Sequence, residues 1–200
     1  HSFEPYSIVN AKLKHHITLN SLESISLHEL GLSDKDDALL FFAPTGRNQG
    51  IGSFDADTMN KGNVEAGKLE LVKGDSYFQK KNISNIGLVK IDVEGYEKLA
   101  MAGLVETIDR NRPILVCEIT YGKQLSFSSR DELLSHLPID YSLYCFDTRK
   151  FDGSKARRKN NKARKSGKYQ LIPFTKWRVA GQDDVIACPN EKLEQLSMKN

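Results

Sequence analysis

The twelve residues from Ile86 to Glu97, IGLVKIDVEGYE, constrain the fold more than any other stretch. They begin with an apolar run, 86–91, interrupted only by a glycine and a lysine, which predicts a strand buried on both faces, as parallel sheets require. Asp92, Glu94 and Gly95 follow directly. Acidic side chains at the carboxyl end of such a strand lie where open α/β sheets bind ligands. Because carboxylates are costly to bury without partners, we predict a functional site here rather than a core.

Strand-like and helix-like segments alternate along the rest of the chain, which predicts an α/β fold with a mostly parallel sheet. Strands are predicted over 25–30, 38–43, 69–73, 86–91, 114–119, 141–146 and 184–189, and a polar turn over 31–37. Helices are predicted over 6–19, 75–81, 94–110, 129–137 and 191–198. The tail, 141–189, is expected to add an antiparallel hairpin at the sheet edge. At 200 residues, the length fits a single domain.

The positive charge is concentrated in one segment. Residues 149–168 contain ten Lys and Arg and a single acid, Asp152, whereas the remaining residues contain 19 basic and 25 acidic side chains. Such a segment could bind nucleic acid or another anionic partner. Lys-rich runs with Asn, Ser and Gly are more often solvated loops, so we interpret it as a basic loop and regard nucleic-acid binding as the less favoured alternative.

The cysteines indicate a reducing environment. Cys117, Cys145 and Cys188 are odd in number, widely spaced and set in apolar runs, which favours buried thiols over a disulfide framework or a zinc site. A cytoplasmic location is therefore expected. No apolar run approaches the ~20 residues of a membrane span.

Three segments together resemble the FkbM family of S-adenosylmethionine-dependent methyltransferases. They are KIDVEGYE at 90–97; FEP at 3–5 with Asn20 and GLSD at 31–34 after it; and RPILVCEI at 112–119. They lie in the family's order and cover roughly residues 1–120. The resemblance implies a Rossmann-like class I methyltransferase fold, S-adenosylmethionine as cofactor, and O-methylation of a sugar or small-molecule hydroxyl.

The resemblance also implies roles for individual residues. Glu4 would hold the ribose, as an acid between a strand and a helix does in nucleotide-binding α/β folds; a plain acid in the first helical turn is the alternative. Leu32 and Ser33 would border the adenine. Asp92 and Glu94 would lie beside the sulfonium group and the substrate. A carboxylate there could take a proton from the acceptor hydroxyl, hold the cofactor's ammonium group or orient a sugar hydroxyl.

Four further residues are candidates for substrate contact or for support of the site. Lys90 interrupts an apolar strand, and an ion pair with Glu118 on the neighbouring strand would explain it. Glu118 also matches an acid in the family's following strand. Asn48 and Ser53 belong to a segment that resembles the family's Gly/Ser approach to the cofactor, although a flexible loop is an equal alternative. The resemblance requires no metal.

This sequence lacks one element of the family pattern. The pattern begins with a strand and helix whose glycine-rich loop wraps the cofactor, ahead of the strand that ends at Glu4, and no such segment is found here. The missing strand is expected to lie between the strands that end at Glu4 and Asp92. We therefore expect an N-terminally incomplete methyltransferase-like domain that binds S-adenosylmethionine poorly by itself. A non-catalytic binding or assembly module of the same fold is the main alternative.

Overall fold

The computed structural model describes residues 1–46, 52–55, 62–146 and 171–196. Its strands are β1 (Ser2–Phe3), β2 (Leu27–His28), β3 (Gly31–Ser33), β4 (Asp37–Pro44), β5 (Asn63–Lys73), β6 (Leu88–Ile91), β7 (Ile114–Tyr121), β8 (Tyr141–Phe146), β9 (Leu171–Pro173) and β10 (Gly181–Pro189). Its α-helices are α1 (Ser7–Leu19), α2 (Gly74–Lys80), α3 (Glu97–Ala102), α4 (Val105–Asn111) and α5 (Arg130–Ser135). A 3₁₀ helix spans Asn190–Gln195. No helix among these residues is long and apolar enough to cross a membrane.

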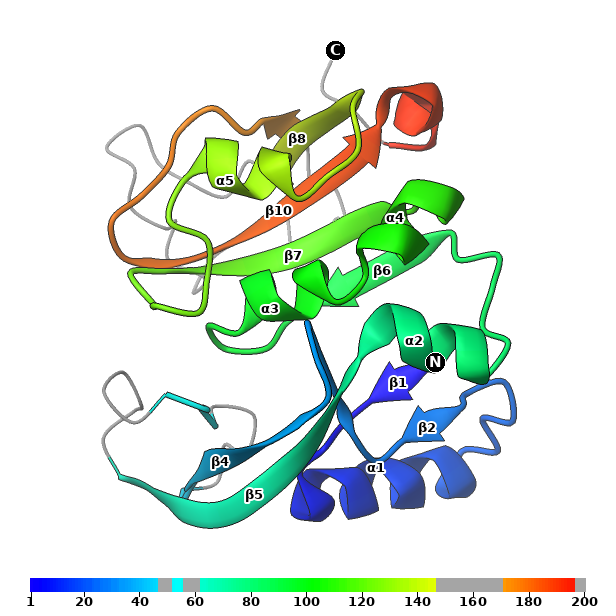
Figure 1. Ribbon diagram of the computed structural model, residues 1–200, viewed down its shortest axis with the longest axis vertical. Coiled ribbons are helices and arrows are strands. Elements are labelled where there is room, and N and C mark those ends of the chain that lie inside the picture. Colours follow the sequence, from blue (N-terminus) through cyan, green and yellow to red (C-terminus); the bar gives the residue numbers. More distant parts are fainter. Residues whose placement is uncertain (47–51, 56–61, 147–170, 197–200) are drawn as a thin grey trace.

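A five-stranded sheet forms the upper half of the molecule in Figure 1, in the order β6-β7-β10-β8-β9. Helices α3, α4 and α5 lie on one face of it. Leu115, Cys117 and Ile119 alternate along β7 and are buried, because successive strand residues point to opposite faces. They join Met101 and Ile108 from the helices in the main core.

Two smaller sheets form the lower half in Figure 1. Strands β1 and β2 pair in parallel, while β5 lies between β3, which is parallel to it, and β4, which is antiparallel. Strands β1 and β6 therefore belong to different sheets. The segments that carry Glu4 and Asp92 follow strands that do not pair with each other within the described residues.

The expectation of a mostly parallel sheet is wrong, because the sheets are mixed. In the five-stranded sheet only β6 and β7 are parallel, and the other neighbours are antiparallel. Strand β10 runs antiparallel to both of its neighbours, β7 and β8, and β8 runs antiparallel to β9. Strands β8 and β9 do form an antiparallel pair at the sheet edge, but β10 inserts between β7 and β8.

Two local predictions around the central stretch also need correction. The strand predicted to be buried on both faces is β6, in which only Ile91 is buried and Leu88 is 62% exposed, because β6 is the last strand of its sheet. The helix predicted over 94–110 is two helices, which are interrupted at Gly103. A Cβ atom at Gly103 would lie 1.8 Å from the carbonyl oxygen of Ser33, so the chain passes against β3 at this point. The polar turn predicted over 31–37 likewise contains β3.

Candidate functional site

Three carboxylates meet at the carboxyl ends of β6 and β7. The parallel register pairs Ile91 with Cys117, which places Asp92 beside Glu118. Glu94 reaches the same place from a left-handed turn, with φ of 50° at Glu94 and 102° at Gly95. One carboxylate oxygen from each of Asp92, Glu94 and Glu118 lies within 4.8 Å of the others. The structure therefore brings together three of the residues that the sequence indicated.

Burial and the close approach of these carboxylates raise the proton affinity of Glu94 and Glu118. Burial, the neighbouring charge of Asp92 and a hydrogen bond with Asp92 raise the pKa of Glu118 to about 7, with Asp184 and Glu94 adding to the effect. Burial and the charge of Asp92 also raise the pKa of Glu94. Like charges at this separation resist simultaneous ionisation, so the cluster retains a proton close to neutral pH.

Lys90 neutralises one member of the cluster. Its Nζ forms an ion pair with Asp92, and both side chains are about half exposed. The predicted pairing of Lys90 with Glu118 is therefore wrong. Residues two apart on a strand project to the same side, which brings Lys90 to Asp92.

Gln182 connects two of the carboxylates and was missed in the sequence. Its Nε2 donates to Glu94 Oε2 and to Glu118 Oε2, each at 3.1 Å. Gln182 lies on β10, whose antiparallel register pairs it with Thr120 on β7. No motif marked this glutamine, because the predicted strand began only at Asp184.

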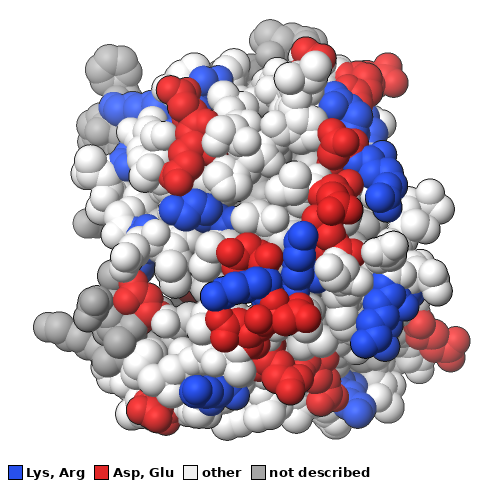
Figure 2. Space-filling view, viewed as in Figure 1, with Lys and Arg blue, Asp and Glu red and all other residues white. Residues whose placement is uncertain are grey.

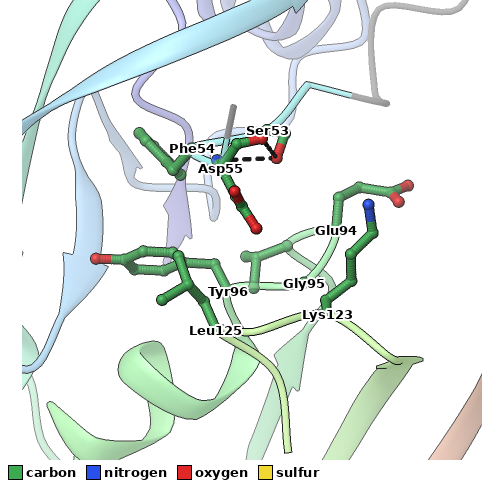
Figure 3. Close-up of a pocket in the computed structure, with 9 residues that line it drawn as sticks. Ser53, Phe54, Asp55, Glu94, Gly95, Tyr96, Lys123 and Leu125 are labelled. Atoms are coloured by element: carbon green, nitrogen blue, oxygen red, sulfur yellow. Dashed lines mark hydrogen bonds between the residues drawn. The ribbon is translucent and has the colours of Figure 1, made fainter. Parts of the chain in front are cut away.

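A small, open pocket lies beside Glu94 (Figure 3). It is lined by Ser53, Phe54, Asp55, Val93, Glu94, Gly95, Tyr96, Lys123 and Leu125. In Figure 3 the Glu94 carboxylate and the Lys123 ammonium group extend side by side, with Asp55 on the opposite wall. The charge of Lys123 partly offsets the rise in the pKa of Glu94. The pocket is thus lined mainly by polar groups of both charges.

Ser53 reaches this pocket, whereas Asn48 lies outside the described residues. Ser53 is buried and forms an isolated antiparallel bridge with Phe42 of β4. Its hydroxyl accepts a hydrogen bond from Asp55 N at 3.1 Å, which shapes the wall that faces Glu94.

Glu4 follows β1 and lies at the start of the first helical segment. Its Oε1 accepts a hydrogen bond from Tyr6 N at 2.8 Å, and burial raises the pKa of its carboxyl group. Glu4 does not line the pocket beside Glu94. Four aromatic rings join the two regions, with centroids 5.1 Å apart from Tyr6 to Phe41, 5.2 Å from Phe41 to Phe54 and 5.1 Å from Phe54 to Tyr96.

Ser33 and Leu32 lie on β3, between these two regions. Ser33 is buried, and its hydroxyl is 2.9 Å from the hydroxyl of Tyr96, which lines the pocket. It also donates to Asp34 Oδ1 at 3.1 Å. Leu32 packs against the main core. Ser33 is therefore linked directly to the pocket wall, whereas Leu32 contacts the main core.

Comparison with known proteins assigns the family. Residues 1–143 match the family model described as the methyltransferase FkbM domain. The chain belongs to the FkbM methyltransferase family. Among solved structures it is similar to the methyltransferase FkbM from Methylobacillus flagellatus KT, at 18% identity and a TM-score of 0.42. That similarity covers 70% of this chain and 31% of the other, so this chain spans about a third of that protein's length. No curated protein matches the sequence.

The FkbM match ends within β8, so it contains the three carboxylates but not β10. Gln182 therefore comes from a part of the chain beyond the FkbM match. Oxygen ligands such as those of Asp92, Glu94 and Glu118 can hold a divalent cation. Acidic groups also converge without one. The carboxylates alone do not assign a metal to this FkbM-family chain.

The basic segment 149–168 lies outside the described residues. On the face shown in Figure 2, which carries α2 and α3, acidic side chains gather in a contiguous area just below the middle, with Lys and Arg side chains above and around it.

Proposed function

We propose that this chain forms part of an S-adenosylmethionine-dependent O-methyltransferase that acts on a hydroxyl group of a sugar or another small molecule. One observation carries the proposal: Asp92, Glu94 and Glu118 converge beside a polar pocket in a chain of the FkbM family. A pocket with carboxylate, ammonium and hydroxyl groups suits a hydroxylated acceptor better than an apolar one.

Residues beside the pocket and across the row of aromatic rings from it include groups that suit the cofactor. Glu4 offers a half-buried carboxylate, which would accept hydrogen bonds from the ribose hydroxyls. Leu32 and Ser33 would border the adenine, and Asp92 would lie near the methionine part. S-adenosylmethionine supplies an electrophilic methyl group bound to a sulfonium. When bound, the cofactor would supply this methyl group to the acceptor oxygen and would leave as S-adenosylhomocysteine.

The residues of this chain would orient the acceptor and remove its proton. Methyl transfer is an in-line displacement, so positioning provides much of the rate. A general base works best when its pKa is close to the operating pH, and the pKa of Glu118 is about 7. Glu94 lies within reach of the same acceptor, because it lines the pocket and shares Gln182 with Glu118. We therefore assign proton removal to the Glu94–Glu118 pair.

The test uses the full-length gene product, with S-adenosylhomocysteine as the probe. At a ligand concentration 100 times the Kd, binding stabilises the native state by about 2.7 kcal/mol. For a domain of this size, that raises the Tm by roughly 5–10 °C. The Glu4→Gln variant should show a smaller rise, because an amide is a poorer acceptor than a carboxylate for two ribose hydroxyls.

Activity is measured separately as transfer of labelled methyl groups to a panel of sugars and small alcohols. Glu94→Gln and Glu118→Gln should lower the transfer rate by about 10²-fold or more, the range for loss of a general base. They should leave most of the thermal shift intact. An unchanged Tm of the full-length protein at millimolar S-adenosylhomocysteine would reject the cofactor assignment.

A further inference from the structure

Glu97, the last acid of the KIDVEGYE motif, is a fully buried charged residue with no role assigned so far. It opens α3, and its side chain is 0% exposed. Its Oε1 accepts two hydrogen bonds, from Gly95 N at 2.8 Å and from Thr120 Oγ1 at 3.0 Å. Isolated ionised carboxylates are seldom buried without a cation, and burial raises the pKa of Glu97.

The hydrogen bond from Gly95 to Glu97 stabilises the turn that orients the Glu94 side chain. A non-glycine residue at positive φ, such as Glu94 at 50°, is strained and persists only where neighbouring contacts fix it. Gly95, at 102°, continues the same left-handed path. The hydrogen bond from Gly95 N to Glu97 Oε1 is a contact of the kind that would hold this turn closed.

The hydrogen bond from Thr120 links Glu97 to β7, the strand that carries Glu118. Thr120 and Glu118 are two residues apart on β7 and project to the same side of the sheet. Gln182 Nε2 lies 3.5 Å from Thr120 Oγ1 and donates to both Glu94 and Glu118. A single oxygen of Glu97 therefore joins the turn before α3 to the end of β7, which are the two supports of the Glu94–Glu118 pair.

The other oxygen of Glu97 indicates its protonation state. Glu97 Oε2 and Ser126 Oγ are both buried, and neither has a hydrogen-bond partner of good geometry among the described residues. The Ser126 hydroxyl lies close enough to lower the pKa of Glu97, although burial has the larger effect in the opposite direction. A proton on Oε2, donated to Ser126 Oγ, would satisfy both atoms at once and would leave no buried charge.

We propose that Glu97 is a positioning residue, whose neutral buried carboxyl group holds the Glu94 turn against the end of β7 and so fixes the Glu94–Glu118 pair. The proposal extends the function proposed above. Glu97 does not line the pocket. It would act on the acceptor only through Glu94 and Glu118.

The experiment compares Glu97→Gln, which keeps an acceptor oxygen and a donor for Ser126, with Glu97→Leu, which keeps neither. The first readout is the pKa of Glu118, followed by NMR of the labelled carboxyl carbon, which needs no activity. We expect a value near that of the wild type in Glu97→Gln and a lower value in Glu97→Leu, because release of the turn takes the charge of Glu94 away from Glu118. Glu106→Gln, which removes an exposed acid on α4, is the matched control and should leave this pKa unchanged.

A second readout is methyl transfer by the full-length protein. Glu97→Leu should lower kcat at least tenfold with little change in S-adenosylhomocysteine binding, whereas Glu97→Gln should stay within about twofold. If Glu97→Leu does not fold, Thr120→Val removes one of the two bonds and should lower the Glu118 pKa by a smaller amount. An unchanged Glu118 pKa in every folded variant would overturn the proposal, as would an equal fall in Glu97→Gln and Glu97→Leu. Absence of transfer by the wild type, with the NMR result intact, would reject only the function.

Discussion

Replacing Gly103 with alanine should destabilise the chain although the backbone there accepts alanine. Gly103 ends α3 in a right-handed helical conformation, with φ of −74° and ψ of −8°. An added Cβ would lie 1.8 Å from Ser33 O and 2.6 Å from Ser33 C, whereas real Cβ contacts stay above 3.0 Å. Both atoms belong to the backbone, so no side-chain rotation relieves the clash, and β3 must retreat by more than 1 Å.

The expected cost follows from two opposing effects. Overpacking of this kind costs about 1–3 kcal/mol, and a rigid backbone neighbour favours the upper end. Alanine gains about 0.4–1 kcal/mol by restricting the unfolded chain. The net loss is about 2 kcal/mol, which for a chain of this length lowers the Tm by roughly 4–8 °C. Retreat of β3 would also pull Ser33 away from Tyr96 and so loosen the pocket wall.

Thermal and urea unfolding of Gly103→Ala and Gly87→Ala would measure this loss of stability. Gly87→Ala is the matched control, because it makes the same chemical change at a site where an added Cβ meets nothing within 4 Å. Its Tm should equal or slightly exceed that of the wild type. If Gly103→Ala unfolds at the same temperature as Gly87→Ala, the close packing of α3 on β3 is refuted.

Two further predictions concern buried acids. Asp75 is buried and accepts hydrogen bonds from the backbone amides of Glu106 and Thr107 at the start of α4. Asp75→Ala should therefore lower the free energy of unfolding, measured in urea, by about 2 kcal/mol, and Asp75→Asn should lower it less. Equal losses in the two variants would contradict the capping role. Glu118 binds its proton more tightly in the folded state, with a pKa of about 7 against an ordinary 4.5, so stability should fall as pH rises between these values. The fall should flatten in Glu118→Gln, and parallel pH profiles would contradict it.

The central motif could be located from the sequence because its signals are local. An apolar run that stops at an acid marks where a strand ends, as Asp92 does after β6, and Glu118 is the acid within the next apolar run, β7. Parallel pairing of β6 and β7 then places the two acids together without further information. The start of the helix predicted over 129–137 is also set locally, because the Ser129 hydroxyl accepts a hydrogen bond from Glu132 N at 3.0 Å, three residues away.

The features that the sequence did not reveal depend on distant parts of the chain. The burial of β6 could not be read from its apolar residues, because it depends on whether a neighbouring strand covers the outer edge. The interruption between α3 and α4 depends on the approach of Ser33, about seventy residues earlier. A single glycine in a helical pattern carries no signal of such a contact, since isolated glycines also occur within helices.

The carboxylate cluster shows how the local and the distant contributions combine. The motif supplies Asp92 and Glu94, and β7 supplies Glu118, so the presence of three acids is fixed within the region that matches the FkbM family. Their charge state is not fixed there, because Gln182 reaches both Glu94 and Glu118 from β10, beyond that region. A donor shared between two carboxylates favours the ionised form of each, and so opposes the rise in pKa that burial and mutual repulsion cause. Chains that share the motif but differ in this tail should therefore carry the same acids with different proton affinities.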